Sequence, residues 1–324
     1  MPELNIVEAI NLALKQEMQK DKKIVLLGED VGKEGGVFRV TTGLQQLYGN
    51  QRVIDTPLSE SGIIGTSIGM AAYGLKPVAE IQFSGFIYPG FDQLISHASR
   101  IRNRTRGRFT CSMVVRTPNG GGIRALEHHS ESTEALYMHT PGLKVVIPST
   151  PSDAKGLLIS AIRDPDPVIF LEPIRIYRAI KQEVSAEEYI IPLGKAAIRK
   201  EGGDVTLITY GALVRDALAA ADTLAKENIS CEVIDLRTLN PLDEQTIITS
   251  VIKTGRAVII HEGPRMCGIG AEIAAILMEK TLYSLKAPVA RVTGFDTVFP
   301  LYMNEHHYIP DVFRITEAVR EVLA

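Results

Sequence analysis

Short apolar runs alternate with longer amphipathic stretches along the first half of the chain. The apolar runs are IVLLG at 24–28, VAEIQF at 78–83, SMVVRT at 112–117, KVVIP at 144–148 and PVIFL at 167–171. Runs of this length without alternation are typical of strands buried on both faces of a parallel sheet. Helical periodicity between them, at 59–75, 88–104 and 151–163, completes a βαβ rhythm. The pattern therefore predicts a doubly wound α/β domain over residues 1–185.

The pattern changes at residues 186–203, where charge, glycine and proline replace the apolar runs. Such a composition is typical of a linker. A second series of apolar runs follows: DVTLITY at 204–210, SCEVIDL at 230–236, AVIIHE at 257–262 and APVARV at 287–292. We therefore expect a second α/β domain over residues 204–324. Two domains suit a chain of 324 residues, which is about twice the usual domain size.

Composition narrows the class of protein. The chain is 45% hydrophobic and 23% charged with a net charge of -3, which is ordinary for a soluble protein and gives no sign of nucleic-acid binding. Cys111, Cys231 and Cys267 are far apart, so they favour a reducing compartment over a disulfide framework or a zinc cluster. No apolar stretch reaches the roughly 18 to 20 residues of a membrane span, and no secretion signal is visible. We expect a cytoplasmic protein, or a mitochondrial matrix protein after removal of a transit peptide.

Two glycine-rich segments are candidates for ligand binding. AVIIHEGPRMCGIGAEI, at 257–273, places a turn between a strand and a helix, but it lacks the GxGxxG spacing of a dinucleotide site, so a structural turn is favoured. PNGGGIRALEHHSES, at 118–132, has three consecutive glycines before His128 and His129. Because glycines are costly to order, this loop must approach something closely or move. A metal site at the two histidines is a weak interpretation, and a solvated surface turn is the simpler one.

Glu60 opens a predicted helix that is rich in small residues, including Gly62, Gly65 and Gly69. Such a helix is buried on nearly all sides and lets other backbone approach closely. Two interpretations of Glu60 remain open. It can be a helix cap or dipole partner worth about 1 kcal/mol, or a carboxylate presented into a site beside a packed interface. Spacing alone favours the cap.

Longer motifs resemble those of a known family. They include LLGEDVGKEGGVF, RVIDTPLSESGIIGTSIGMAAYGLKPVAEIQFSGF, the run from HHSESTEALYMHTPGLKVVIP to PVIFLEP, CEVIDLRTLNPLD and SVIKTGRAVIIHEG. In these motifs the chain is similar, over essentially its whole length, to the β subunit of pyruvate and branched-chain 2-oxo acid dehydrogenases. These are the thiamine-diphosphate-dependent decarboxylating components of large complexes. The resemblance implies a pyrimidine-binding-type domain followed by a transketolase C-terminal-like domain.

The resemblance also implies that the chain supplies half of an active site. In this family two α and two β chains form a heterotetramer, with thiamine diphosphate at each α/β interface. The α chain holds the diphosphate and Mg²⁺ through a GDG motif and paired asparagines, neither of which occurs here. The implied partners are an α subunit, a second β subunit and the lipoyl acyltransferase core, with no nucleic acid or membrane. The second domain would serve dimerisation and docking.

Motif matching assigns roles to individual residues on the pyrimidine side. Glu60 matches the glutamate that hydrogen-bonds the aminopyrimidine nitrogen and favours the imino tautomer, which takes the thiazolium proton. Glu29 matches a second acidic residue of the pocket, on a proton path between active sites. Leu58, Gln82 and Phe86 match positions lining the pyrimidine, with Phe86 a candidate for ring stacking.

The loop at 118–132 matches the family's catalytic loop. By this match His129 orders the loop and assists acyl transfer to the lipoyl group, and the glycines suit a loop that admits a lipoyl arm and excludes water. Many relatives have another histidine where this chain has Arg124, while His128 is an extra neighbour. Either imidazole therefore remains a candidate for the working group.

Family β subunits also hold a potassium-like ion through backbone carbonyls, which leave little side-chain signature. The matching positions are Met113, Ala161, Arg163, Asp164 and Asp166.

The predicted function is oxidative decarboxylation of pyruvate with acyl transfer to lipoyl-lysine. A branched-chain 2-oxo acid dehydrogenase or an acetoin dehydrogenase is the alternative within the family. Outside it, a nucleotide-dependent oxidoreductase would need the turn at 257–271 to bind NAD. A non-catalytic scaffold would keep the fold alone, and the presence of both Glu60 and His129 counts against it.

Overall fold

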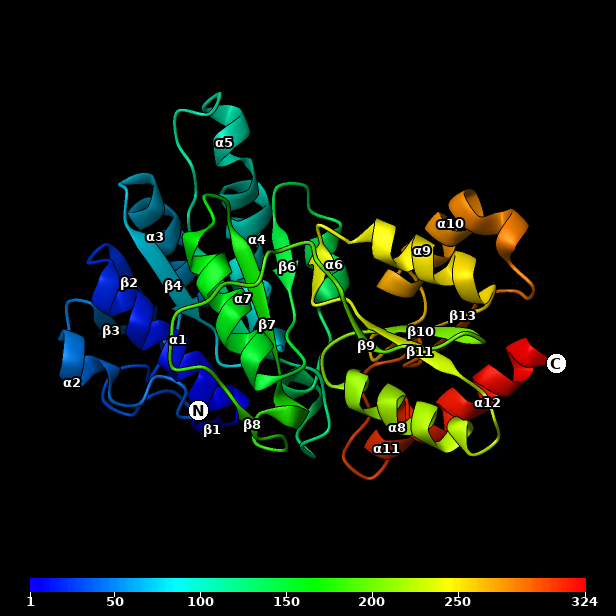
Figure 1. Ribbon diagram of the computed structural model, residues 1–324. Coiled ribbons are helices and arrows are strands. Elements are labelled where there is room, and N and C mark those ends of the chain that lie inside the picture. Colours follow the sequence, from blue (N-terminus) through cyan, green and yellow to red (C-terminus); the bar gives the residue numbers. More distant parts are fainter.

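The buried apolar runs form two main sheets in the computed structural model, which describes residues 1–324. The larger sheet has the strand order β12-β6-β7-β5-β4-β2-β3 and is parallel except for β12. Its strands are β2 (Ile24–Gly28), β3 (Val53–Asp55), β4 (Lys76–Glu80), β5 (Val114–Asn119), β6 (Lys144–Val146), β7 (Val168–Pro173) and β12 (Thr238–Asn240). This sheet and its helices form the first of two domains that lie side by side (Figure 1).

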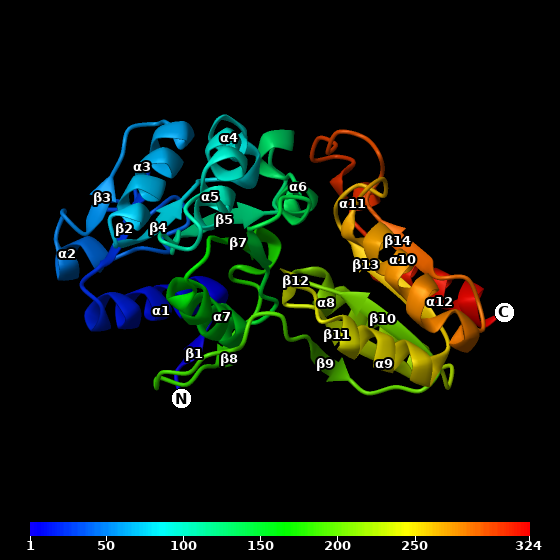
Figure 2. The ribbon, with the colours of Figure 1, turned by 90° about the horizontal axis from the view of Figure 1, so that it is seen from above.

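Helices cover both faces of this sheet (Figure 2). On one face α1 (Ile6–Lys20) packs against α7 (Pro151–Arg163), and on the other α3 (Glu60–Ala72) packs against α4 (Tyr88–Ser96). Leu26 and Leu27, adjacent in β2, point into the two opposite hydrophobic clusters. That arrangement explains why the strands read as continuous apolar runs. The remaining elements of this domain are α2 (Leu44–Tyr48), α5 (Ile101–Arg104), α6 (Glu134–Met138) and an antiparallel pair, β1 (Glu3–Leu4) with β8 (Gln182–Glu183).

The second sheet has the order β14-β13-β10-β11-β9, with only β9 antiparallel. Its strands are β9 (Ala197–Lys200), β10 (Val205–Thr209), β11 (Cys231–Asp235), β13 (Ala257–His261) and β14 (Ala290–Thr293). In Figure 1, α8 (Leu213–Ala225) and α12 (Val312–Leu323) lie below it, and α9 (Glu244–Thr254) and α10 (Ile269–Thr281) lie above it. The short helix α11 (Glu305–Tyr308) precedes α12. None of the helices combines the length and apolarity that crossing a membrane requires.

The structure confirms the predicted α/β class with two domains and differs from the pattern in detail. β9 lies within the stretch predicted as a linker, so the second sheet begins before residue 204. The helix predicted at 88–104 is interrupted after Ser96, and there Ser99 Oγ donates to the Ile95 carbonyl at 3.0 Å. Such side-chain bonds to the preceding turn bend helices. β3 was not predicted, because its two apolar residues, Val53 and Ile54, stand between Arg52 and Asp55 and do not form an apolar run.

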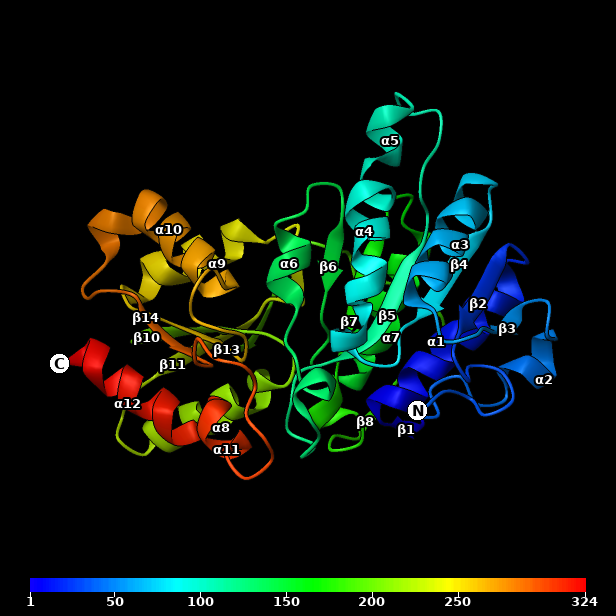
Figure 3. The same ribbon diagram turned by 180° about the vertical axis from the view of Figure 1, so that it is seen from behind.

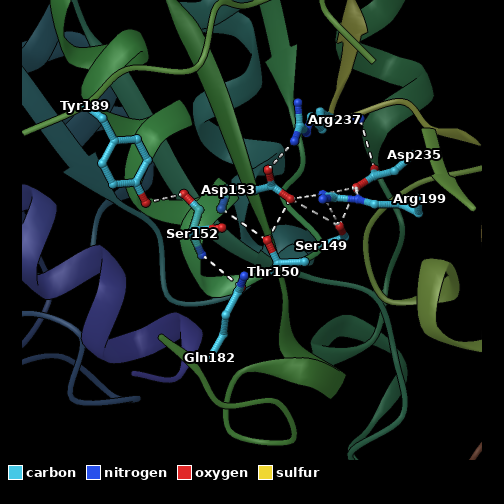
Figure 4. A network of polar contacts seen from close by, with 9 residues as sticks. All are labelled: Ser149, Thr150, Ser152, Asp153, Gln182, Tyr189, Arg199, Asp235 and Arg237. Atoms are coloured by element: carbon cyan, nitrogen blue, oxygen red, sulfur yellow. Dashed lines mark hydrogen bonds and ion pairs between the residues drawn. The ribbon is translucent and has the colours of Figure 1, made fainter. Parts of the chain in front are cut away.

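Apolar and charged contacts join the domains. One hydrophobic cluster continues from Leu143 and Val145 of the first domain into the second, and Figure 3 shows α6 and β6 at this junction. Beside it, Arg199 of β9 pairs with Asp153 of α7 and with Asp235 of β11, the latter at 2.7 Å (Figure 4). Both carboxylates are fully buried. The ion pairs and the shared core therefore fix one domain against the other.

Candidate active site

The predicted cofactor residues follow the carboxyl ends of neighbouring parallel strands. Glu29 follows β2, Glu60 follows β3, Gln82 follows β4, and His129 lies in the loop after β5. These four strands are adjacent in the sheet, in the order β5-β4-β2-β3. Loops at the carboxyl edge of an open parallel sheet form its usual ligand crevice. The topology therefore brings together residues that are distant in the sequence.

Glu60 is the first residue of α3, yet it does not cap the helix. Ser59 does so, with its Oγ accepting from the Gly62 N–H at 3.3 Å. The Glu60 side chain is 9% exposed, and its carboxylate has no hydrogen-bond or ion-pair partner in the chain. The positive end of the helix dipole favours its charge. The side chain is thus a buried carboxylate at a helix start, free to accept from a ligand.

A second carboxylate lies close to Glu60. Burial raises the pKa of Glu29, and the negative charges of Glu60 and Asp30 raise it further. Gln82 lies beside them, with its Nε2 donating to Asp30 at 3.3 Å. Glu29 therefore takes up a proton more readily than an isolated glutamate does.

The rim of this site is apolar and open. Leu58, two residues before Glu60, is 80% exposed. A hollow of about 260 Å³ lies beside it between the carboxyl ends of β2 and β3 and the start of α3. The hollow is lined by Leu27, Ile54, Thr56, Pro57, Ser59, Gly62, Ile63, Thr66 and Met70.

Aromatic contacts fix the ring of His129, which ends the 3-10 helix η3 (Glu127–His129). Its centroid lies 4.4 Å from that of Phe83 and 5.1 Å from that of Phe86, both edge-on. Phe86 belongs to the 3-10 helix η1 (Ser84–Ile87), which packs on η3. Gly85 permits this approach, since a Cβ there would lie 2.3 Å from the carbonyl oxygen of His128. His129 Nδ1 is buried without a partner.

His128 has a different environment. It is exposed, its Nδ1 lies 3.7 Å from Glu131 Oε1, and its ring centroid lies 6.2 Å from that of Tyr88. Tyr88 in turn donates to Glu131. His129 thus packs on Phe86 and His128 does not. The choice of His129 as the loop histidine stays a prediction.

The positions matched to a potassium-like ion lie apart from these residues, at the amino edge of the sheet. They are Met113, Ala161, Arg163, Asp164 and Asp166. The carbonyl of Met113 accepts from the Val168 N–H at 3.0 Å, and that of Asp164 accepts from Ser112 Oγ at 2.8 Å. No group of three or more His, Cys, Asp or Glu side chains that could hold a metal ion is present. The ion assignment stays a prediction that rests on backbone carbonyls alone.

Three residues at the site were not anticipated from the sequence. Phe83 ended a predicted strand, whereas the strand stops at Glu80 and Phe83 turns toward His129. Glu262 and Glu305 belong to the second domain, yet their carboxylates accept backbone N–H groups of the histidine loop. Glu262 ended the run predicted as a strand at 257–262, and an acid at the end of an apolar run is the one signal that it carried in the sequence.

Comparison with known families agrees with this architecture. Residues 2–179 match the transketolase pyrimidine-binding domain, and residues 194–315 match the transketolase C-terminal domain. A solved structure described as a split gene transketolase, inactive beta4 tetramer, shares the fold with a TM-score of 0.82 over 99% of both chains at 23% identity. The fold and the site therefore define a protein of the transketolase-like class of thiamine-dependent enzymes.

Full-length relatives identify the family more closely. The pyruvate dehydrogenase E1 component subunit beta of Acholeplasma laidlawii is 54% identical over 319 residues, which cover 98% of both chains. The protein of the same name from Bacillus subtilis (strain 168) is 50% identical over 323 residues, covering 100% of this chain and 99% of its own. The chain belongs to the family of pyruvate dehydrogenase E1 component β subunits. The resemblance found in the sequence motifs is confirmed.

Proposed function

We propose that this chain forms the pyrimidine half of a thiamine diphosphate site and, with an α subunit, oxidatively decarboxylates pyruvate and transfers the acyl group to lipoyl-lysine of the acyltransferase core. The observation that carries this proposal is Glu60, whose carboxylate is 9% exposed and has no partner in the chain. A buried charge without a partner is costly unless a ligand supplies one. A ring nitrogen that shares its proton would satisfy Glu60, and Glu29 lies close enough for the charge of Glu60 to raise its pKa.

Each residue of the site has a distinct task. The cofactor, when bound, supplies an electron sink for the carbon that loses CO₂. Glu60 holds a proton at the aminopyrimidine nitrogen, and Glu29, with its raised pKa, can receive or return a proton beside it. Phe86 supplies an apolar wall, and His129, held against Phe86, moves a proton during acyl transfer. Together these residues orient the cofactor ring and exchange protons with it.

The other half of the site comes from an α subunit in this proposal. The chain has neither GDG nor paired asparagines, and Leu58 leaves an apolar rim exposed. We propose that the α subunit holds the diphosphate and Mg²⁺ and covers this rim. The purified chain should then fail to decarboxylate pyruvate with thiamine diphosphate and Mg²⁺, and co-expression with an α chain should restore turnover. Strong activity of the chain alone would refute the assignment.

Pyruvate is the proposed substrate because the relatives at 54% and 50% identity are both named as pyruvate dehydrogenase components. Branched-chain 2-oxo acids and acetoin are the competing substrates. Turnover of the assembled enzyme with each of the three at equal concentrations discriminates among them. A higher kcat/KM for a branched-chain acid or for acetoin than for pyruvate would overturn the choice.

Glu60→Gln tests the catalytic assignment directly. Glutamine keeps the size and can hydrogen-bond, but it cannot share a proton as a carboxyl does. We expect turnover of the assembled enzyme to fall by roughly 10²- to 10⁴-fold at saturating thiamine diphosphate, with little change in Tm.

A matched control is Glu8→Gln, because Glu8 also lies in a first helical turn but accepts from the Asn5 N–H at 2.8 Å as part of a capping box. That variant should lose at most about 1 kcal/mol of stability and keep its activity. Near-normal turnover of Glu60→Gln with a lowered Tm would show that Glu60, like Glu8, stabilises its helix and is not catalytic.

A further inference from the structure

Side chains from both domains pack against the three glycines at 120–122. A Cβ at Gly121 would stand 2.3 Å from Phe299 of the second domain, and one at Gly122 would stand 2.3 Å from Arg175. Gly120 and Gly122 also have φ values of +82° and +93°, which side chains rarely adopt. The glycines therefore serve close approach, and the surface that the loop approaches includes the second domain.

Two second-domain carboxylates accept amides from the same loop. Glu262, directly after β13, accepts the Gly121 N–H at 2.5 Å and Ser132 Oγ at 3.4 Å through one oxygen. Glu305, at the start of α11, accepts the N–H groups of Gly122 and Arg124, the latter at 2.9 Å. Both carboxylates are buried. Hydrogen bonds from N–H to a buried carboxylate are stronger than those between neutral groups.

These contacts hold the loop at its base and at residues 121–124. The Gly120 N–H donates to the Glu131 carbonyl at 3.0 Å, which closes the loop across its base. Glu262 ties both ends, Gly121 and Ser132, to one point. The arch at 125–129 lies between the held segments, and its last residue, His129, also packs on Phe83 and Phe86 of the first domain. The place of that imidazole therefore depends on contacts from both domains.

We propose that Glu262 and Glu305 are positioning residues, through which the second domain holds the loop at 118–132 and thereby sets the place of His129 during acyl transfer. This inference rests on the proposed function of His129. It gives the second domain a task at the active site besides the expected ones in dimerisation and docking. Both carboxylates accept backbone N–H groups of the loop, so their effect passes through the loop backbone.

Hydrogen–deuterium exchange of the assembled αβ enzyme tests the structural step without relying on activity. Glu262→Ala should raise the exchange rate of amides in residues 118–132 by about tenfold, because the acceptor for Gly121 is lost. Glu262→Gln keeps a carbonyl acceptor in the same place and should return most of the protection. Glu227→Gln changes an exposed second-domain acid paired with Arg320 and should leave the loop unchanged. Unaltered exchange in Glu262→Ala, with the fold intact, would overturn the proposal.

The catalytic step is tested with two rates of the same enzyme. Glu262→Ala should lower reductive acylation of a lipoyl domain by about tenfold and change decarboxylation with an artificial electron acceptor less than about twofold, while Glu262→Gln recovers acylation. Equal losses in both rates, or a loosened loop with normal acylation, would overturn positioning by Glu262. His129→Ala measured alongside separates the two hypotheses. If His129→Ala acylates normally, the proposed role of His129 fails, whatever the loop exchange shows.

Discussion

Arg199 joins the two domains through carboxylates that water does not reach, and Arg199→Met probes that junction. Its guanidinium donates to Asp235 Oδ2 from Nε at 3.1 Å and from Nη2 at 2.7 Å, and it also pairs with Asp153 (Figure 4). Asp153 and Asp235 are 0% exposed. Arg237 supplies the second cation, 2.9 Å from Asp153. The four charges balance, so loss of Arg199 leaves one uncompensated negative charge inside the protein.

The expected cost follows from that imbalance. Removing one partner of a buried ion pair destabilises a protein by about 3–5 kcal/mol, because the remaining charge stays desolvated. If all 324 residues unfold together, an unfolding entropy of about 2.1 cal/mol/K per residue converts this to a fall in Tm of roughly 4–7 °C.

The stability lost in Arg199→Met should also depend on pH. Burial raises the pKa of Asp235 already in the wild type, with the charge of Arg199 as the main opposing effect. Without Arg199 the folded-state pKa rises further above the unfolded one. A raised carboxyl pKa means that stability falls as pH rises, so the loss in Arg199→Met should be smaller near about pH 5 than near about pH 8.

Calorimetry of the assembled enzyme measures both effects. Arg320→Met is the matched control, because Arg320 pairs with Glu227 at 2.5 Å while both side chains are at least 40% exposed. Its cost should be much smaller, because water and salt screen an exposed ion pair. Asp235→Asn added to Arg199→Met restores the charge balance and should recover part of the loss. Equal shifts in Arg199→Met and Arg320→Met would show that the junction behaves like a surface pair, and the reasoning would fail.

Two further predictions concern the loop and its support. His129→Ala in the assembled enzyme should impair reductive acylation of a lipoyl domain more than cofactor affinity, measured by titration with thiamine diphosphate, and the same pattern in His128→Ala alone would move the assignment by one residue. Burial raises the pKa of Glu262 from 4.5 to about 7, so its contribution to stability falls as pH rises between those values, by at most on the order of 3 kcal/mol. Glu262→Gln has no carboxyl group to titrate, so the Tm of this variant minus that of wild type should rise with pH over the same range. A Tm difference that does not change with pH would contradict the prediction.

The sequence predicted the elements whose physical signal is local. Buried parallel strands carry apolar side chains on both faces, and β2 matches its predicted run from Ile24 to Gly28. Helix α7 begins at Pro151 after the Thr150 cap and ends at Arg163, as the pattern predicted. The elements that escaped prediction depend on a neighbour or are too short for a period. β3 pairs with β2, and its two apolar residues, Val53 and Ile54, stand between Arg52 and Asp55, so the sequence shows no apolar run there.

The residues of the candidate site likewise separate into those with a local sequence signal and those without one. The motif around Glu60 predicted a carboxylate at the cofactor, which stays a prediction, and the strand order explains why Glu60 lies near Glu29. The direction of Phe83 was not predictable, because it depends on the strand ending at Glu80 and on the 3-10 turn that follows. Alternation along a longer strand would have assigned its face, whereas a turn resets it.

The glycines at 120–122 show which structural requirements cannot be predicted from the local sequence. Gly120 and Gly122 have left-handed φ values, so their identity follows from their own backbone. Gly121 has no such φ, and its backbone alone would accept an alanine. Phe299, from the other domain, occupies the space where that methyl group would stand. The requirement for glycine at 121 is therefore a property of the domain contact, and so is the position of the Gly121 N–H that Glu262 accepts. A loop that the sequence presented as either mobile or closely approached is, in the folded chain, closely approached by the second domain.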